Sequence, residues 1–263
     1  RKLFLARDRA GQKPLYYYHK NKTIQFSSEI KGLLADKKIP REIDRSSLKS
    51  FLSIGYTTGS SSIFSNIEKV EPGCFLIFDL ESGKIQANQY WNFPKQKRKK
   101  NQKDYNILLN EFEAIFQNAV SKQLVSDVPL GILLSGGLDS SLITAMASRS
   151  VKNIKTFTVK FSKSKSFDES LHAKLISEFY GTEHYELEAG NIDKDIFQKL
   201  SKQFDEPIID LSMIPTSLVC SLVKDHCTVA LGGDGGDELF GGYNYYRRSA
   251  FLKFYFSWIS KYL

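Results

Sequence analysis

The chain has 263 residues, 41% of them hydrophobic and 13% aromatic, a composition that supports a large buried core and excludes an intrinsically disordered protein. Its net charge of +8 is spread along the sequence, and the one dense basic run, residues 95–100, lacks interleaved aromatic residues for stacking on bases, so we expect no nucleic-acid binding. The three cysteines suit neither disulfides nor a metal site, and no apolar run approaches the ~20 residues of a spanning helix, so we expect a cytoplasmic protein without membrane contact.

The first part of the chain has the pattern of a β-rich layer. We expect short apolar strands at residues 3–7, 14–19, 24–27, 73–79 and 84–89, and helices at 29–34 and 46–54. The chain opens on Arg1 and continues directly into strand-like residues, so we expect it to begin inside a domain. The basic run that follows is expected to be a solvated linker.

A helical spacing of apolar residues from Ile107 to Ala119 introduces a new unit. After it, expected strands at 129–134, 155–161, 183–187 and 227–231 alternate with expected helices at 140–148, 169–180, 192–204 and 212–224. Gly181 is a suitable C-terminal stop for the second of these helices. The alternation is typical of crossover units on a parallel sheet and predicts an α/β fold. The aromatic cluster Tyr245, Tyr246, Phe254, Tyr255 and Phe256 is expected to lie in the core on a helix face, in preference to forming a stacking platform.

The strongest chemical signal lies between an apolar strand and a helical stretch, in the run Leu134-Ser135-Gly136-Gly137-Leu138-Asp139-Ser140-Ser141. In open α/β sheets ligands bind at the carboxyl ends of strands, and a helix N-terminus there favours an anion. The glycines let backbone N–H groups approach phosphate oxygens, and the serines add hydroxyl donors. The run therefore predicts a phosphate cradle.

This run is not the usual P-loop, because it contains no lysine and does not match that motif's spacing. Asp139 alone would repel phosphate, so we expect it to bind the Mg²⁺ that neutralises the nucleotide. The run resembles the loop of the N-type ATP pyrophosphatases, which split ATP into AMP and pyrophosphate. The alternative is a glycine-rich turn with a capping aspartate, which needs no nucleotide.

A second signal follows another apolar strand, the one expected at 227–231, in the run Gly232-Gly233-Asp234-Gly235-Gly236-Asp237-Glu238. Glycines among carboxylates suit a dinucleotide fingerprint badly, and the acids lack the spacing of an EF-hand calcium loop. With Mg²⁺ or an amine present, such carboxylates can hold the metal, orient an ammonium ion and accept a proton.

These runs occur in a familiar order. The stretches 7–17, 26–31, 135–141, 167–169 and 233–243 follow one another as they do in glutamine-dependent asparagine synthetases, and the chain resembles that family over nearly its whole length. The resemblance implies the β-rich tail of an N-terminal-nucleophile glutaminase domain at 1–94 and a basic linker at 95–103. It implies the first part of a parallel-sheet ATP pyrophosphatase-like (adenine nucleotide alpha hydrolase-like) synthetase domain at 104–263.

The resemblance also implies a set of site residues. Asp234 would be the catalytic acid important for forming β-aspartyl-AMP, and Asp139 and Asp237 would bind Mg²⁺. Asp168 and Glu169 either contribute to the same ATP site or cap the following helix, and both interpretations stay open. His172 and His184 are expected to have ordinary surface or core roles. The implied ATP contacts are Leu134, Ser135, Gly136, Gly137, Asp139 and Ser140, with Val159, Gly232 and Gly233 near the nucleoside.

The reaction implied is asparagine biosynthesis: ATP adenylates aspartate, and ammonia released from glutamine then displaces AMP. The expected partners are these small molecules, and a homodimer is compatible with the resemblance. The family's N-terminal nucleophilic cysteine is absent from this chain and Cys74 lies in no matching context, so we expect no glutaminase activity from this stretch alone. Two alternatives remain open: amidation of another carboxylate, such as one on a sugar or secondary metabolite, and nucleotide binding without catalysis.

The chain also departs from the family's pattern at two positions. Gly232 stands where many relatives have Ser, and Asp234 where some have Glu. Both departures leave the exact subfamily open.

Overall fold

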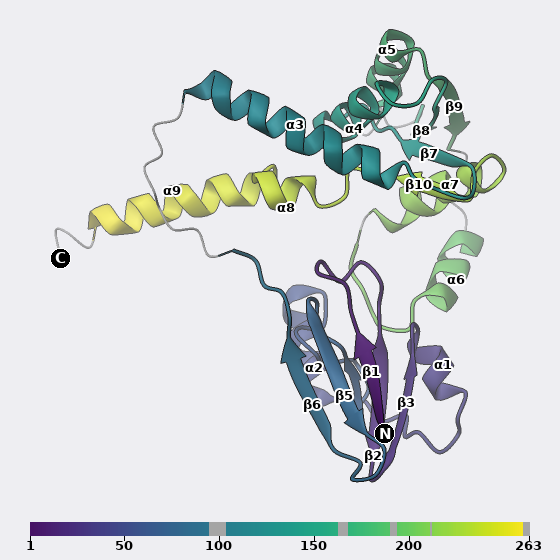
Figure 1. Ribbon diagram of the computed structural model, residues 1–263, viewed down its shortest axis with the longest axis vertical. Helices are drawn as coiled ribbons and strands as arrows, with labels where there is room; N and C mark the ends of the chain where they lie inside the picture. Colours follow the sequence, from purple (N-terminus) through teal and green to yellow (C-terminus); the bar gives the residue numbers. More distant parts are fainter. Residues whose placement is uncertain (95–103, 163–167, 190–193, 211, 260–263) are drawn as a thin grey trace. The chain divides into compact units, whose positions relative to one another are not determined.

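A computed structural model describes residues 1–94, 104–162, 168–189, 194–210 and 212–259 (Figure 1). The expected linker at 95–103 and Phe167 lie outside these residues. The chain divides into two compact units, unit 1 at Arg1–Lys100 and Asp193–Leu211, and unit 2 at Asn101–Ile192 and Ser212–Leu263. The sequence did not predict that residues 193–211 group with unit 1. The expected domain boundaries stay a prediction.

Unit 1 contains two antiparallel sheets (Figure 1). One has the order β1-β5-β6 and the other β3-β2-β4. Adjacent tyrosines of β2 point to opposite faces of the second sheet, because side chains alternate along a strand. Tyr17 packs with Leu5 and Leu76 of the first sheet, whereas Tyr18 packs with Ile30 and Leu33 of α1. The elements are β1 (Lys2–Ala6), β2 (Tyr16–Lys20), β3 (Thr23–Ser27), α1 (Ile30–Leu34), α2 (Arg45–Ile54), β4 (Ile67–Lys69), β5 (Cys74–Asp79), β6 (Ile85–Gln89) and α6 (Lys194–Gln203).

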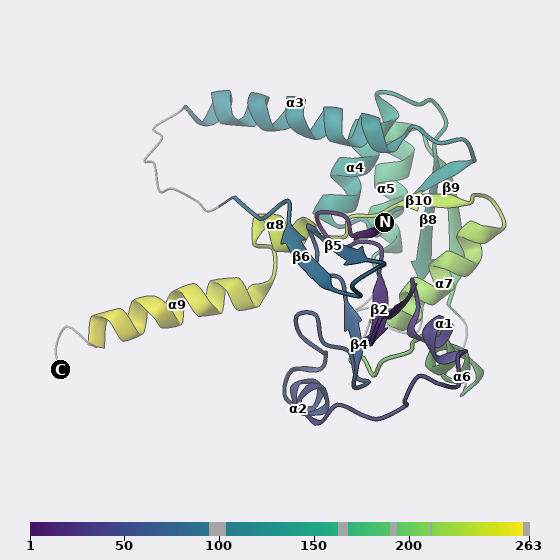
Figure 2. The ribbon, with the colours of Figure 1, turned by 60° about the horizontal axis from the view of Figure 1, so that its bottom comes forward.

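Unit 2 is built on a four-stranded sheet of order β10-β7-β8-β9, in which all neighbouring strands are parallel (Figure 2). The predicted parallel α/β fold is therefore confirmed, and the structure supplies the strand order that the sequence left open. The elements are α3 (Tyr105–Gln123), β7 (Leu130–Leu133), α4 (Leu138–Ser148), β8 (Lys155–Lys160), α5 (Ser170–Tyr180), β9 (Glu183–Glu188), α7 (Met213–Lys224), β10 (Val229–Leu231), α8 (Gly236–Phe240) and α9 (Asn244–Ile259).

Helices cover both faces of this sheet. Ile132 of β7 packs against Val120 of α3 and Met146 of α4 on one face. Phe157 of β8 packs against Val223 of α7 on the other face. Consecutive strand residues point to opposite faces, so a strand buried between helices is apolar at nearly every position. This double burial explains the apolar runs of β7 and β10, whereas β8 buries the threonines Thr156 and Thr158 on one of its faces.

The prediction of a buried aromatic cluster near the end of the chain is wrong. These residues do lie on a helix, α9, but Tyr245, Tyr246, Tyr255 and Phe256 are all exposed, and the side chain of Phe254 lies outside the described part of the chain. Apolar residues recur on every side of α9, so helical spacing alone did not reveal which side chains are covered.

No helix in the described ranges combines the length and the hydropathy that a membrane crossing requires.

Candidate functional site

The turn between β7 and α4 is held together by its serine hydroxyls. Ser135 Oγ lies 3.0 Å from Ser140 Oγ and accepts a 3.2 Å hydrogen bond from the backbone N–H of Gly137. Ser140 Oγ in turn donates to the Gly137 carbonyl at 3.3 Å. Gly137 is the N-cap of α4, so the turn delivers the chain directly into a helix N-terminus.

Several backbone donors in this turn are free. Within the described part of the chain, the N–H groups of Gly136, Leu138 and Asp139 have no hydrogen-bond partner. The first N–H groups of a helix lack intrahelical acceptors, and together with the helix dipole they favour an anion. The residues present therefore fit a phosphate group.

Gly136 is required by its surroundings as well as by its backbone. Its φ is +81°, and a Cβ there would lie 2.7 Å from both His172 Cβ and Ala173 N. The first turn of α5 thus packs directly on the turn after β7. Sequence reasoning missed this contact, because His172 offered no motif and was assigned an ordinary role.

The acidic run after β10 lies beside this turn. β10 pairs parallel with β7, so the segments that follow these two strands leave the sheet at the same edge. A Cβ on Gly233 would lie 3.1 Å from Asp139 Cβ, and a Cβ on Gly236 would lie 2.5 Å from Asp139 Cγ. The two predicted runs therefore meet, with the Asp139 carboxylate against the backbone of the second run.

The other carboxylates of this run point to separate places. Asp234 Oδ2 turns back toward Gly232, where a Cβ would lie 2.6 Å from it. The Asp237 carboxylate lies against Gly242 at the C-terminal end of α8, and the Asp237 carbonyl accepts the Gly242 N–H at 3.0 Å. Hydrogen bonding to Glu238 raises the pKa of Tyr243, so this phenol stays protonated at neutral pH.

The described residues contain no group of three or more His, Cys, Asp or Glu side chains placed to hold a metal ion. Mg²⁺ is commonly bound through one or two carboxylates, with phosphate oxygens and water as the remaining ligands. The Asp139 carboxylate lies against Gly236 and the Asp237 carboxylate against Gly242, and no contact among the described residues joins the two. Their assignment as metal ligands stays a prediction.

The remaining predicted nucleotide contacts belong to the same strand ends. Leu134 donates its N–H to the Phe157 carbonyl at 2.9 Å, and Thr158 Oγ1 donates to the Leu134 carbonyl. These bonds join the carboxyl ends of β7 and β8, and Val159 follows in β8. The structure thus brings the strand-end residues of β7, β8 and β10 to one edge of the sheet.

Asp168 serves the start of α5. Its carboxylate accepts the Ser170 N–H at 3.1 Å, and hydrogen bonding from Ser170 lowers its pKa. The N-cap residue itself is Glu169, whose side chain makes no capping bond. The Asp168 bond supports the capping interpretation, although the helix begins one residue later than expected and Asp168 therefore lies just before the N-cap residue. Gly181, in the left-handed conformation, ends the helix as predicted.

His184 has a core environment on β9. Its Nδ1 lies 2.9 Å from Thr156 Oγ1, and burial lowers its pKa despite the opposing charge of Glu186. The prediction of an ordinary interior role is confirmed for this residue.

Part of the motif at residues 7–17 organises a loop rather than a reactive centre. Arg7 donates to the carbonyls of Lys13, Val70 and Gly11 at 2.9 to 3.0 Å. Asp8 accepts the backbone N–H of Lys13 at 3.0 Å, and backbone hydrogen bonds, led by that one, lower its pKa. These contacts fix the connection between β1 and β2.

Comparisons with known proteins match two family models to different parts of the chain. Residues 111–262 match the family model for asparagine synthase, and residues 1–91 match the model for a glutamine amidotransferase domain. A putative asparagine synthetase [glutamine-hydrolyzing] 2 of Methanocaldococcus jannaschii is 35% identical over 246 residues, which cover 92% of this chain and 47% of the relative. Asparagine synthetase [glutamine-hydrolyzing] 1 of Bacillus subtilis is 36% identical over 259 residues, which cover 95% of this chain and 39% of the relative.

More distant relatives differ in their names. Amidase chry2 of Gibberella zeae is 28% identical over 278 residues, covering 97% of this chain and 40% of that protein. An NH3-dependent NAD synthetase from Campylobacter jejuni has a TM-score of 0.35 and 20% identity, over 54% of this chain and 62% of its own. The chain spans less than half the length of the curated relatives named here.

Proposed function

This chain belongs to the asparagine synthase family, and from that membership we propose that it is part of an ATP-dependent asparagine synthetase that takes its nitrogen from glutamine. The observation that carries the proposal is the contact of Asp139 with Gly233 and Gly236. Because of it, a phosphate bound at the N-terminus of α4 lies next to the acidic run in which a carboxylate can act.

We assign the binding of ATP phosphates to the turn after β7. The free N–H groups of Gly136, Leu138 and Asp139 and the hydroxyls of Ser135 and Ser140 support this assignment. Leu134, Gly137, Val159, Gly232 and Gly233 complete the proposed nucleotide contacts. Mg²⁺, held by Asp139 and Asp237, would neutralise charge on the departing pyrophosphate.

In the proposed reaction, a side-chain carboxylate oxygen of aspartate attacks the α-phosphorus of ATP, and the bond to the bridging oxygen of pyrophosphate breaks. Ammonia then attacks the carbonyl carbon of the resulting mixed anhydride, and AMP leaves with the former carboxylate oxygen. The nitrogen loses a proton as the amide forms. We assign Asp234 the role of orienting the reacting groups and accepting that proton.

A second candidate is the amidation of a different carboxylate. It stays a candidate because one relative that matches nearly all of this chain is not named an asparagine synthetase. A third is nucleotide binding without catalysis. Both leave the proposed phosphate contacts unchanged and differ only in what happens beside the bound ATP.

Small molecules are the proposed partners: aspartate, ATP, and glutamine or ammonia. A homodimer stays a prediction.

A cytoplasmic location is supported by the three cysteines, Cys74, Cys220 and Cys227, all of which are free. Burial raises the pKa of the Cys74 thiol, which supports a structural rather than a nucleophilic role for it.

The test is release of pyrophosphate from Mg-ATP by the complete protein, with L-aspartate and a panel of other carboxylates. Release that depends on aspartate, together with formation of asparagine, supports the synthetase. Release with another acid alone supports the second candidate. A protein that binds ATP but releases no pyrophosphate with any acid contradicts both enzyme assignments.

A further inference from the structure

Residues 202–209 lie between α6 and α7, inside the stretch that matches the asparagine synthase family, yet they fold with unit 1. We call these residues the strap. The strap carries Glu206, whose side chain is only 15% exposed. A carboxylate so deeply covered requires compensating donors.

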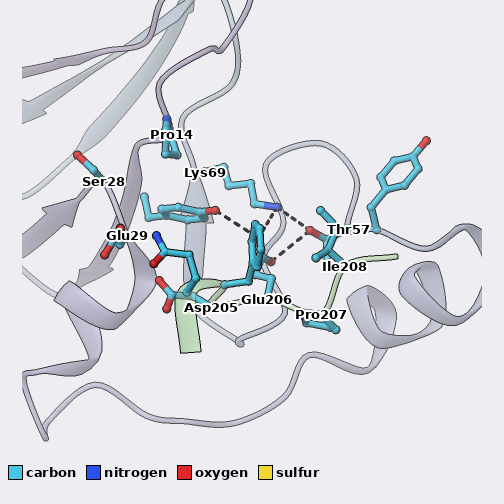
Figure 3. Close-up of a pocket in the computed structure, with 13 residues that line it drawn as sticks. Pro14, Ser28, Glu29, Thr57, Lys69, Asp205, Glu206, Pro207 and Ile208 are labelled. Carbon is cyan, nitrogen blue, oxygen red and sulfur yellow. Dashed lines mark hydrogen bonds and ion pairs between the residues drawn. The ribbon is translucent and has the colours of Figure 1, made fainter. Parts of the chain in front are cut away.

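Glu206 finds four such donors on unit 1 (Figure 3). Lys69 Nζ lies 2.8 Å from Oε2 in an ion pair, and the backbone N–H of Ile63 donates to Oε1 at 2.8 Å. The hydroxyl of Thr57 donates to Oε1 at 3.2 Å and that of Tyr16 to Oε2 at 3.3 Å. Burial, followed by the charge of Glu206, raises the pKa of Tyr16 to about 12, so this phenol remains a donor at neutral pH.

The other attachments of the strap involve fewer donors to one side chain. Asp205 accepts the backbone N–H of Lys31 at 3.0 Å, and Lys31 Nζ donates to the Gln203 carbonyl at 2.9 Å and lies 3.4 Å from the other oxygen of Asp205. The Lys31 side chain is 42% exposed, so its ion pair contributes little. The Ile209 N–H donates to the Gly55 carbonyl at a long 3.3 Å. Removing one partner of a buried pair, in contrast, leaves an uncompensated charge. Glu206 is therefore the main anchor of the strap.

The pair lies at a pocket in unit 1. The pocket has a volume of about 380 Å³, and its lining includes Lys69 and Glu206 together with Tyr56, Phe204 and Pro207.

The strap leads along the chain into α7. Val223 of α7 packs against Phe157 of β8, and the Phe157 carbonyl accepts the N–H of Leu134 at the start of the phosphate turn. Within unit 2, α7 is thus packed on the strand that bonds to the start of the phosphate turn.

We propose that the Lys69–Glu206 pair is a latch that holds the strap on unit 1, and that the latch must be closed for nitrogen from glutamine to be used in unit 2. The second part rests on the proposed function. Transfer of a reactive group between two parts of a chain depends on their being held in a productive arrangement. Glu206 is a positioning residue, since it acts through the strap and not on the reactants.

The first arm of the test measures hydrogen exchange on this chain. Glu206→Gln and Lys69→Met should each speed amide exchange at Ile209 by about tenfold or more, because the buried pair is lost. Amides in the β1-β5-β6 sheet should keep their rates. The control is Glu113→Gln, which breaks the exposed ion pair of Glu113 with Arg149. It should change neither the exchange rate at Ile209 nor the rates in the β1-β5-β6 sheet. Faster exchange throughout unit 1, or no change at Ile209, overturns the latch.

If a single variant fails to fold, the double variant carrying both substitutions removes both buried charges and serves instead. It should fold, because a neutral pair needs no compensation, but the strap should still exchange faster than in the wild type. Wild-type protection of Ile209 in this double variant overturns the latch.

The second arm compares glutamine with free ammonium as nitrogen source for the complete protein. Glu206→Gln should lower the glutamine-dependent rate by about tenfold while leaving the ammonium-dependent rate within about twofold. Equal loss with both sources overturns the inference but leaves the proposed function standing. A wild type that uses ammonium but not glutamine also overturns it. A wild type active with neither contradicts the proposed function itself, and the exchange arm still decides whether the latch exists.

Discussion

The carboxylate of Asp139 lies directly against the backbone of Gly236, so close that a Cβ on the glycine would be 2.5 Å from Asp139 Cγ. This contact joins two runs that are nearly a hundred positions apart in the sequence. It also leaves no space for a side chain between them, which makes the contact easy to test.

Gly236→Ala should displace Asp139 and weaken Mg-ATP binding by about tenfold or more, since overpacking of this kind costs about 1–3 kcal/mol. The matched control is Gly235→Asn. Gly235 has a φ of +87°, which asparagine tolerates, and a Cβ there would meet nothing within 4 Å. Calorimetric titration with Mg-ATP should separate the two variants. Equal affinities would show that the Asp139 contact is irrelevant to nucleotide binding.

Gly136→Ala is expected to destabilise unit 2. The positive φ costs a non-glycine residue about 1–2 kcal/mol, and the clash with His172 and Ala173 adds about 1–3 kcal/mol. Gly181→Ala is the comparison, because Gly181 has a φ of +65° but open space around it, so only the backbone cost applies. Urea unfolding of both variants gives the difference. A loss at Gly136 no larger than that at Gly181 contradicts the close approach of α5.

His184 should make stability depend on pH. Its pKa in the folded protein is lowered below the ordinary value of 6.5 by burial, so the unfolded chain binds its proton first as pH falls. The stabilisation is fully present above pH 6.5 and is lost as pH falls below that value toward the folded pKa. The free energy of unfolding of wild type should therefore drop more steeply between pH 7.5 and 5.5 than that of His184→Gln. Parallel curves for the two proteins would refute the assignment.

The sequence predicted most of unit 2 because buried parallel strands and their covering helices leave strong periodic patterns. β8, for example, begins at Lys155 as expected and ends at Lys160, one residue earlier than predicted. The glycine and serine pattern likewise indicated the turn after β7. Local chemistry of this kind needs no knowledge of distant residues.

Contacts between distant residues left no such pattern. Lys69 and Glu206 are separated by more than half the chain, and neither belongs to a motif, so the folding of residues 193–211 with unit 1 was not predicted. The short strand β4, which presents Lys69, was also missed. The position of His172 beside Gly136 depends on how α5 packs, which periodicity does not encode.

Asp234→Asn tests the chemistry rather than the binding. The Asp234 carboxylate turns toward Gly232 at the end of β10 and makes no contact that holds the fold together among the described residues. The amide has nearly the same shape but does not accept a proton at neutral pH. Formation of the amide product should fall by about 100- to 10,000-fold, the range for a lost general base, while Mg-ATP affinity changes little. Asp225→Asn, at the C-cap of α7 before β10, is the matched control and should keep full activity. If Asp234→Asn instead loses Mg-ATP binding and retains turnover at saturating nucleotide, Asp234 is a binding residue and the proton must leave through another group.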